Sequence, residues 1–527
     1  MTSRFYVSFV LFALLTVALV SGSMILFHPW HGEGSHYYVQ KSIAMELIKR
    51  GHNITFLVDN KFEEPIKLDG QKEGFSVEVF HSPIELSEYN IVMHNTNKTG
   101  LRGKYFEFAT ELLQTDYMQR QATECSNLLS DEKVVSNLKH FDLAIEDPMS
   151  TCPFVQYLKI PYVMVAPVMF LPCLTSLEGR FPFYPSYMPE FATALDHKMS
   201  FMERLKNTAF VILFTYYIRS GVLYSYNEIL EKYYMGDKSL LQVLYADAEM
   251  WLINTDFVLD FPRPVLPNTA LVGGLTAAQG KPLSSDWEDF LQSAGDDGVV
   301  LFSMGSYATG IDEDIAALFA GAFAQLPQKV IWKLNGKPSS TLTANVKVVD
   351  WIPQNDLLAH PQIKVFVYHC GLNGIWEAVY HGVPMVAIPL FGDQFDNAQR
   401  LVSRGMGVKV DIATLTSDEL AEAIRTVINN PSYKDNATRI SSIFRDRSRT
   451  PAEEAADWLE YVIRHGGAKH LRSAALDLNI FQYFLLDVMA VLLVAFLTVF
   501  AILICCCRLC FRGCRKVCGR TTKAKSE

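Results

Sequence analysis

The sequence lacks the glycine patterns with which many nucleotide-dependent enzymes hold phosphate. No Gly-x-Gly-x-x-Gly follows a predicted strand, which argues against a dinucleotide-dependent oxidoreductase, and the Gly-x-x-x-x-Gly-Lys-Ser/Thr pattern of P-loop NTPases is missing. Positive charge is also scarce, because 56 acidic residues outnumber 47 lysines and arginines and give a formal net charge of -9. This balance argues against nucleic-acid binding.

Cysteine is scarce outside the C-terminal end. Cys125, Cys152, Cys173 and Cys370 are too few and too scattered to predict a disulfide framework or a Cys-x-x-Cys metal site. The other cysteines are Cys505, Cys506, Cys507, Cys510, Cys514 and Cys518. If the apolar stretch before them spans a membrane, these residues are open to reversible palmitoylation.

The longest apolar runs lie at the two ends. Residues 1–23 combine Arg4, an apolar run and a small Ser-Gly-Ser flank, which predicts a secretory signal peptide cut after Ser23. The alternative is a first transmembrane helix, but the run is short and no stop-transfer charge follows it. Residues 488–507 carry no charge and are long enough to cross a bilayer core of about 30 Å. Residues 508–527 are strongly basic, so the sequence predicts a single-pass type I protein with a lumenal body and a cytoplasmic tail.

The lumenal part is long enough for two domains, and a proline-rich seam lies at residues 260–268. Before it, "SMILFHPW", "HYYVQKSIAMELIKRG" and "NITFLV" have the patterns of a strand, a helix and a strand. After it, strands such as "GVVLFSMGS", "KVIWKL" and "KVFVYHC" alternate with helical stretches. This rhythm predicts an α/β fold of two facing doubly wound, Rossmann-like domains, residues 24–262 and 263–480. Sequons at Asn53, Asn97 and Asn436 fit the secretory route, although such triplets also arise by chance.

Polar residues gather after two predicted strands of the second domain. His369 ends one strand, Asn373 begins a helix whose free amides favour phosphate, and Glu377 lies one turn further along the same face, suited to ribose hydroxyls. Asp393 and Gln394 follow the next strand, as an acid and an amide suited to sugar hydroxyls. Singly, each has a plain alternative: a core histidine, a solvated helix residue, a helix cap. Together they favour a nucleotide-sugar site.

The segment from "WIPQNDLLAHP" through "HCGLNGIWEA" to "GVPMVAIPLFGDQFDNA" resembles the signature of the UDP-glucuronosyltransferase family. The resemblance extends over nearly the whole chain, including "FPRPVLPN", "LFSMGS", the apolar anchor and the basic tail. It implies a GT-B fold with one C-terminal transmembrane helix, and inverting, metal-independent transfer of a sugar from a UDP-sugar to a small lipophilic acceptor. No cofactor is implied, because the UDP-sugar is a co-substrate.

The resemblance also assigns roles to residues. Trp351 would stack on uracil, where a core tryptophan is the plain alternative, and Gln354 would help to hold the nucleoside. Glu377 would bind the ribose, and Asp393 with Gln394 the transferred sugar. The residues expected around the diphosphate are Ser303, Gly305, Ser306, His369 and Asn373.

Activation of an acceptor hydroxyl requires a base, and the first domain should supply it. The family's catalytic histidine matches His36; spacing alone would leave His28, His31 and His52 as competitors. A carboxylate fixes the tautomer of such a base. The family's aspartate partner matches Asp147; Glu146 is its neighbouring rival, but side chains alternate at a strand end, so both should not face the cleft.

The only Asp-x-Asp of the lumenal body, at 312–314, opens a predicted helix, where acids favour the dipole, so we expect no metal. Asn254 stands where many glucuronate-using relatives carry an arginine, which makes it a candidate for donor selectivity. Glucuronic acid is the nominal donor sugar, UDP-glucose is the alternative donor, and a catalytically silent UDP-sugar-binding membrane protein is a second alternative.

The acceptor site is the least legible. Residues 160–191 predict an irregular apolar wall, and residues 209–218 predict a core helix or a segment that contacts membrane lipid. Lys523 and Lys525 resemble the dilysine retrieval signal of the endoplasmic reticulum, although they could be ordinary basic flank. The expected partners are a UDP-sugar, a lipophilic acceptor and membrane lipid, with a homo- or hetero-oligomer left open.

Overall fold

The computed structural model describes residues 22–30, 34–86, 99–102, 115–150, 152–168, 172–234, 244–305, 311–336 and 341–523. Two compact units divide the chain after Leu471. The signal peptide, Asn97, His31 and Ser306 lie outside the described residues, as does Lys525.

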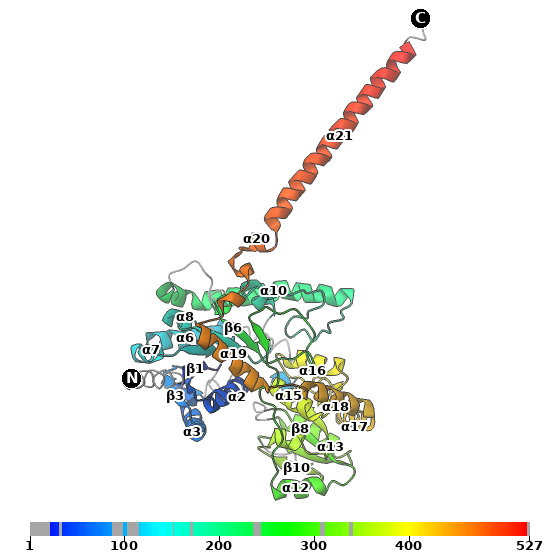
Figure 1. The fold of residues 1–527 in the computed structure, drawn as a ribbon. Helices are drawn as coiled ribbons and strands as arrows, with labels where there is room; N and C mark the ends of the chain where they lie inside the picture. Colours follow the sequence, from blue (N-terminus) through cyan, green and yellow to red (C-terminus); the bar gives the residue numbers. More distant parts are fainter. Residues whose placement is uncertain are drawn as a thin grey trace, which may run out of the picture. The chain divides into compact units, whose positions relative to one another are not determined.

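The first unit contains two all-parallel sheets, which confirms the predicted doubly wound architecture (Figure 1). The first sheet has the order β3-β2-β1-β4-β5-β6-β7. Its strands are β1 (Met24–His28), β2 (Asn53–Asp59), β3 (Ser76–Phe80), β4 (Leu143–Glu146), β5 (Tyr162–Ala166), β6 (Met250–Ile253) and β7 (Thr269–Leu271). Its strand order reverses between β1 and β4, where Leu26 is paired with Ala144. We call this sheet with its helices the first lobe.

The helices of the first lobe cover both faces of the sheet, because β1, β4 and β5 are apolar on both sides and, apart from the exposed Met24, buried. They are α2 (Ser35–Lys49), α3 (Glu63–Glu73), α6 (Thr115–Ser130), α7 (Glu132–Leu138), α8 (Phe154–Leu158), α9 (Pro172–Glu178) and α10 (Phe201–Tyr233). Helix α2 ends as predicted, with Gly51 at φ 90°, a left-handed backbone that glycine adopts without strain.

The second lobe repeats the design with the order β10-β9-β8-β11-β12-β13. Its strands are β8 (Val299–Ser303), β9 (Lys329–Lys333), β10 (Val346–Val349), β11 (Ile363–Tyr368), β12 (Met385–Ala387) and β13 (Gly407–Lys409). Its helices are α12 (Ser285–Gln292), α13 (Glu313–Phe323), α14 (Gln354–Leu358), α15 (Leu372–His381), α16 (Gln394–Ser403), α17 (Ser417–Asn429) and α18 (Pro431–Arg445). The strand order reverses between β8 and β11, so each lobe has one switch point at the carboxyl ends of its strands.

Two elements beyond the proline-rich seam still contact the first sheet. Strand β7 pairs with β6 in parallel, and helix α19 (Pro451–His465) packs on α2, as Figure 1 shows. Helix α19 begins with a capping box of Thr450 and Glu453 and buries Leu459 and Val462 in the first lobe. The limits 24–262 and 263–480 therefore stay a prediction, and the chain crosses between the lobes more than once.

The structure adds a disulfide that the cysteine count did not predict. Cys125 on α6 is bonded to Cys152, with 5.2 Å between their Cα atoms. The spacing of the cysteines along the chain does not predict this disulfide, because the packing of α6 beside the loop that follows β4 brings the two cysteines together. Cys370 is free and buried.

Two predicted apolar segments of the first lobe differ from expectation. Residues 160–191 are not irregular throughout, because they contain β5 and the short helix α9. Residues 209–218 lie inside α10 and are only half in the core. Phe214 and Ile218 pack against the lobe, whereas Leu213 and Tyr216 are 69% and 75% exposed.

The second unit contains two short 3-10 and α-helical turns, among them α20 (Ile480–Tyr483), and the long helix α21 (Leu486–Lys523). Helix α21 holds the predicted span 488–507. Within the described part of the chain, Leu486–Lys516 is the one helical stretch long and apolar enough to cross a membrane.

Candidate active site

The switch point of the first sheet holds two histidine–carboxylate pairs. His36 lies in the first turn of α2, and its Nδ1 is 2.6 Å from the Asp147 Oδ2 atom. Asp147 follows β4 directly and is fully buried, and its Oδ1 atom also accepts the Met149 amide at 2.9 Å. With the carboxylate accepting a proton from Nδ1, the Nε2 atom of His36 is left as an acceptor.

The second pair is formed by the rival residues. His28 Nδ1 is 2.9 Å from Glu146 Oε2, and both residues are buried. Because Glu146 and Asp147 alternate at the strand end, they take different histidine partners, as the strand geometry predicts. Burial raises the pKa of Glu146, although the His28 ring opposes the shift. His52 lies elsewhere, with its Nε2 atom 3.3 Å from Glu460.

The second lobe reaches this site through Asn373. Its Nδ2 atom donates to the Ser35 carbonyl at 3.2 Å, which joins the N-terminus of α15 to that of α2. Asp393 is the other link, because the charge of His36 acts on its carboxyl group. Burial nevertheless raises the pKa of Asp393. The two switch points therefore face each other across a short distance.

The switch point of the second sheet brings together a glycine turn and a buried histidine. Ser303 ends β8 and accepts the Gly305 amide with its Oγ at 3.2 Å. Gly305 has φ 87°, and a Cβ there would lie 2.5 Å from the His369 ring, so only glycine fits. Burial lowers the pKa of His369 to about 3, and among the described residues its buried Nδ1 has no hydrogen-bond partner. The ring is neutral, and Nδ1 could donate to a phosphate only in the tautomer that places the ring proton on that nitrogen.

Lys333 is a candidate site residue that the sequence interpretation missed. It ends β9, and its Nζ donates to the Gly305 carbonyl at 3.2 Å. Burial lowers its pKa, and its charge lowers that of His369. The described residues provide no carboxylate partner for Lys333. The signal was available, because a lysine at a strand end beside the switch point follows the same rule that selected His369.

The residues predicted to bind the nucleoside lie on α14, α15 and the loop before α14. Trp351 is 68% exposed, which excludes a core tryptophan and leaves its ring open to a base. Gln354 Nε2 donates to Glu377 Oε2 at 2.5 Å. Burial raises the pKa of Glu377 to about 7, although the Gln354 hydrogen bond opposes it.

The two sugar candidates begin α16. Asp393 occupies the N-cap position but its carboxylate does not cap the helix; it accepts Asn397 Nδ2 at 2.6 Å. Gln394 is almost fully buried, and its Oε1 accepts the Leu390 and Phe391 amides at 2.9 and 3.2 Å. These contacts fix the loop after β12 and hold both residues at the strand's end.

Asn254 has a complete set of protein partners. It is fully buried, its Oδ1 accepts the Gly274 amide at 2.9 Å, and its Nδ2 donates to the Pro167 carbonyl at 3.2 Å. These bonds hold the turn after β7 against the end of β5. They give the Asn254 side chain a structural role that requires no sugar contact. Its role in donor choice stays a prediction.

Three further predicted sites can be located. Asn53 is exposed at the start of β2, whereas Asn436 lies within α18 and donates to the Gly405 carbonyl at 3.2 Å through the nitrogen to which a glycan would be attached. Asp312 is the N-cap of α13 and accepts the Arg102 Nε atom at 3.0 Å, so this carboxylate already has a cationic partner.

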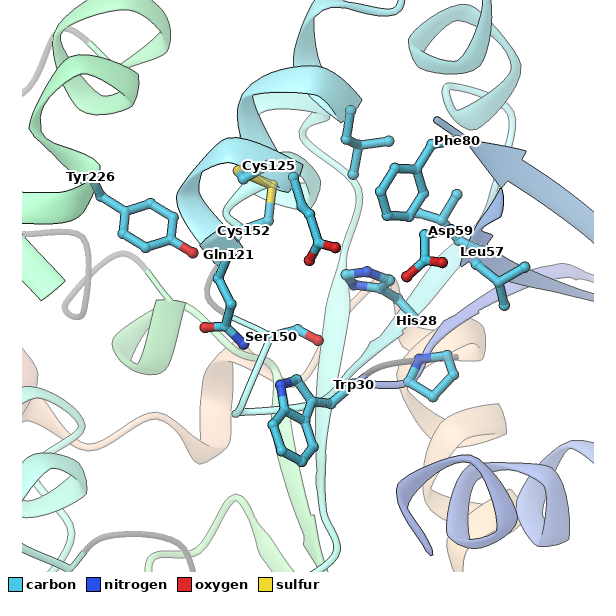
Figure 2. Close-up of a pocket in the computed structure, with 14 residues that line it drawn as sticks. His28, Trp30, Leu57, Asp59, Phe80, Gln121, Cys125, Ser150, Cys152 and Tyr226 are labelled. Carbon is cyan, nitrogen blue, oxygen red and sulfur yellow. A yellow bond between two sulfur atoms is a disulfide. The ribbon is translucent and has the colours of Figure 1, made fainter. Parts of the chain in front are cut away.

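A hollow of about 50 Å³, partly open to solvent, lies beside the two histidine–carboxylate pairs of the first lobe (Figure 2). Trp30 lines it and contacts the His36 ring with 4.9 Å between centroids. Its apolar walls come from Leu57, Phe80, Leu128, Tyr226 and the Cys125–Cys152 disulfide. Its polar side includes Asp59 and Glu124, which share the Lys61 ammonium at 3.2 and 2.7 Å.

A family model described as "UDP-glucoronosyl and UDP-glucosyl transferase" matches residues 24–521. UDP-glucuronosyltransferase 2A2 of Homo sapiens is 39% identical over 507 residues, covering 94% of this chain and 93% of that protein. UDP-glucuronosyltransferase 2B33 of Macaca mulatta is 37% identical over 519 residues, covering 96% of this chain and 97% of that protein.

Solved glycosyltransferases share the fold. The calicheamicin glycosyltransferase CalG4 aligns with TM-score 0.56 and 19% identity over 84% of this chain and 98% of its own. A UDP-glucosyltransferase from Polygonum tinctorium aligns with TM-score 0.59 and 16% identity over 84% of this chain and 99% of its own. The two-lobed arrangement is therefore the GT-B fold.

Proposed function

Because the chain belongs to the UDP-glucuronosyl and UDP-glucosyl transferase family, it is a UDP-sugar-dependent glycosyltransferase, and we propose that it transfers glucuronic acid to small lipophilic acceptors with inversion and without a metal. The observation that carries the mechanism is the His36–Asp147 pair joined to α15 by the Asn373–Ser35 hydrogen bond. This contact puts a candidate base of one lobe beside the candidate donor site of the other.

In the proposed mechanism, His36 Nε2 accepts the proton of the acceptor hydroxyl as that oxygen attacks the anomeric carbon. The bond between the anomeric carbon and the UDP oxygen breaks on the opposite face, which inverts the configuration. Asp147 keeps its proton-accepting contact with Nδ1 and stabilises the imidazolium that forms. The fixed hydrogen bond from the Met149 amide prevents the carboxylate from turning away.

The second lobe would hold UDP through groups gathered at the carboxyl ends of its strands. The α15 N-terminus, the Gly305 turn and the neutral His369 ring offer hydrogen bonds to the diphosphate, and Lys333 offers a positive charge. Trp351 would stack on uracil, Glu377 would accept from the ribose, and Asp393 with Gln394 would contact the hexose. The groups around the diphosphate would stabilise the leaving UDP, a task for which other transferases use a metal cation.

We assign the acceptor's apolar body to the hollow of Figure 2, because it is the lined cavity that adjoins Trp30 and His36. Two carboxylates against one ammonium leave its polar side with a net negative charge. An acceptor that places a remote carboxylate there would be repelled, whereas a remote hydroxyl or amine would be stabilised.

We place the protein in the endoplasmic-reticulum membrane, with its catalytic body in the lumen. The apolar part of α21 and the basic residues at its C-terminal end support anchoring, and the exposed Leu213 and Tyr216 of α10 support contact with membrane lipid. If Lys523 and Lys525 act as a retrieval signal, changing both to serine should release the protein towards the cell surface. Unchanged reticular staining would remove that signal.

UDP-glucose remains the second candidate donor, because Asn254 is neutral where an arginine would pair with a sugar carboxylate. The test is a microsomal assay with a panel of UDP-sugars and one phenolic acceptor. We expect the glucuronide to dominate; a dominant glucoside would replace glucuronic acid by glucose in the proposal. No product with any donor, despite UDP binding, would favour the silent binding protein instead.

A further inference from the structure

A carboxylate on α16 binds two backbone amides of the first lobe. Asp396 Oδ2 accepts the Ala192 amide at 2.7 Å, and its Oδ1 accepts the Ala194 amide at 2.9 Å. Asp396 is buried, and it lies one turn beyond Asp393 on the same helix. The helix that begins with the two sugar candidates therefore also holds a turn of the opposite lobe.

The bound turn has an unfavourable backbone. Ala192 and Ala194 have φ of 60° and 53°, the left-handed region that residues with a Cβ avoid. Thr193 between them donates to the Glu190 carbonyl at 2.7 Å and tightens the turn. Two alanines in this conformation need a compensating interaction, and a charged acceptor for both exposed amides supplies it.

The turn presents Phe191 to the contact between the lobes. Phe191 lines a small cavity together with Val168 and Thr255 of the first lobe and Leu372 and Asp393 of the second. On its other side Phe191 packs against the apolar core of the first lobe. Moving the turn would therefore move an aromatic wall that lies beside the sugar candidate Asp393.

The charge of Arg400 favours the ionised form of Asp396, which can accept both amides of the turn. Arg400 is one turn further along α16, and its Nε donates to Asp260 Oδ1 at 2.8 Å while its Nη1 donates to Asn397 Oδ1 at 2.8 Å. Burial raises the pKa of Asp396 to about 6, and the positive charge of Arg400 opposes that shift without a direct hydrogen bond to Asp396 in the described structure. The Asp396 carboxylate therefore accepts its hydrogen bonds from the two backbone amides of the turn.

We propose that Asp396 is a positioning residue that holds the 190–194 turn against α16 and thereby sets where Phe191 confines the acceptor relative to the donor sugar. The role rests on the proposed function, because it concerns the placement of the acceptor. Asp396 touches neither the diphosphate nor the nucleoside residues.

The main variant is Asp396→Asn, which keeps the side chain's size but leaves one oxygen acceptor for two amides. With a hydroxycoumarin as acceptor, we expect its KM to rise by about tenfold, the loss of one charge-assisted hydrogen bond, while the dissociation constant of UDP changes less than about twofold. Ser403→Ala is the matched control, because Ser403 also joins α16 to the first lobe, but through Asp196, which lies outside the 190–194 turn; it should leave the acceptor KM unchanged.

A rescue separates positioning from general stability. Adding Ala192→Gly and Ala194→Gly to Asp396→Asn removes the strain that the carboxylate offsets, because glycine adopts left-handed backbone readily, and should restore at least part of the acceptor KM. In the Asp396-containing protein the two glycines should change little. If acceptor KM stays normal in Asp396→Asn, or if UDP affinity falls as much as acceptor KM rises, the proposal is wrong.

Two further measurements test the proposal if the Asp396→Asn variant does not fold or if the wild-type protein shows no turnover. If Asp396→Asn does not fold, Phe191→Ala should still raise the acceptor KM and leave UDP affinity unchanged; an unaltered KM would contradict the role of the turn. If the wild-type protein shows no turnover, the proposed function fails, but hydrogen exchange still decides on the contact. Asp396→Asn should speed exchange of the Ala192 and Ala194 amides about tenfold or more, and unchanged exchange would overturn it.

Discussion

The two switch points of the molecule have the same topology but opposite chemistry. At the β1/β4 switch point, both histidines have carboxylate partners, His36 with Asp147 and His28 with Glu146. At the β8/β11 switch point, His369 has an unpartnered nitrogen among the described residues, and Lys333 has no described acid beside it. A paired histidine keeps a defined tautomer and can accept a proton, whereas unpaired donors are suited to an anion that arrives with the ligand. In the proposed mechanism, the same strand order would serve proton transfer in one lobe and phosphate binding in the other.

The largest expected effect breaks the pairing at the first switch point. Asp147→Asn should lower kcat by about 10³-fold, because an amide no longer stabilises the imidazolium and can favour the wrong tautomer. Its matched control is Glu146→Gln, which alters the neighbouring histidine pair. We expect the control to change kcat less than about tenfold. Equal losses in kcat for both variants, with UDP affinity intact, would show that the two pairs are not distinct in function.

A smaller effect removes the unpaired charge at the second switch point. Lys333→Met keeps the length of the side chain and should weaken binding of a UDP-sugar by about tenfold, the loss of one charge-assisted contact. Uridine, which has no phosphate, should bind equally well to both proteins. Isothermal titration with the two ligands measures the difference. A uniform loss for uridine and UDP-sugar would mean that Lys333 supports the fold of the site and does not contact the diphosphate.

Glu377 should make nucleotide binding depend on pH. Its pKa lies at about 7 in the free protein because of burial, and a ribose hydroxyl donates best to the ionised carboxylate. The ionised fraction, and with it the affinity, should therefore fall as pH decreases through 7, by about tenfold between pH 8 and pH 6. A UDP-sugar is the suitable ligand, because its diphosphate does not titrate in this range. Glu377→Gln should bind more weakly at pH 8 and show a flat profile; a sloping profile in that variant would assign the titration elsewhere.

The smallest effect concerns acceptor charge in the hollow. Two phenols of equal size, one with a remote amine and one with a remote carboxylate, should differ in kcat/KM by about fivefold to tenfold in favour of the amine, given one uncompensated carboxylate near the ligand. Glu124→Gln should reduce that ratio, whereas Glu132→Gln, on the neighbouring helix α7, should not. A ratio that is the same in all three proteins would place the acceptor outside this hollow.

Much of the architecture could be predicted because parallel strands are apolar on both faces and end in glycine, histidine or acidic residues. Strands β1, β8 and β11 are examples, and the residues at their tips lie where their position in the sequence placed them. The role of Trp351 could not be decided from the sequence alone, because a tryptophan can be buried in the core or exposed for stacking. The exposure of Trp351 in the structure excludes the core position.

The features that escaped prediction depend on contacts between distant segments. The Cys125–Cys152 bond, the return of α19 to the first lobe and the Asp396 contact to Ala192 and Ala194 join residues without any local pattern. Asn254 is a case in which sequence comparison suggested a role without showing the side chain's contacts. Its comparison with arginine in relatives suggested a sugar contact, but its amide is hydrogen-bonded to backbone groups of segments far from it in the chain.

The central claim is that His36 is the base of a transferase whose donor site lies in the other lobe. The most direct measurement is the turnover of His36→Ala with a UDP-sugar and a phenolic acceptor, together with its affinity for UDP. We predict that kcat falls by about 10³-fold or more, while the dissociation constant of UDP changes less than about twofold. Undiminished conjugation by a protein that still binds UDP would contradict the account.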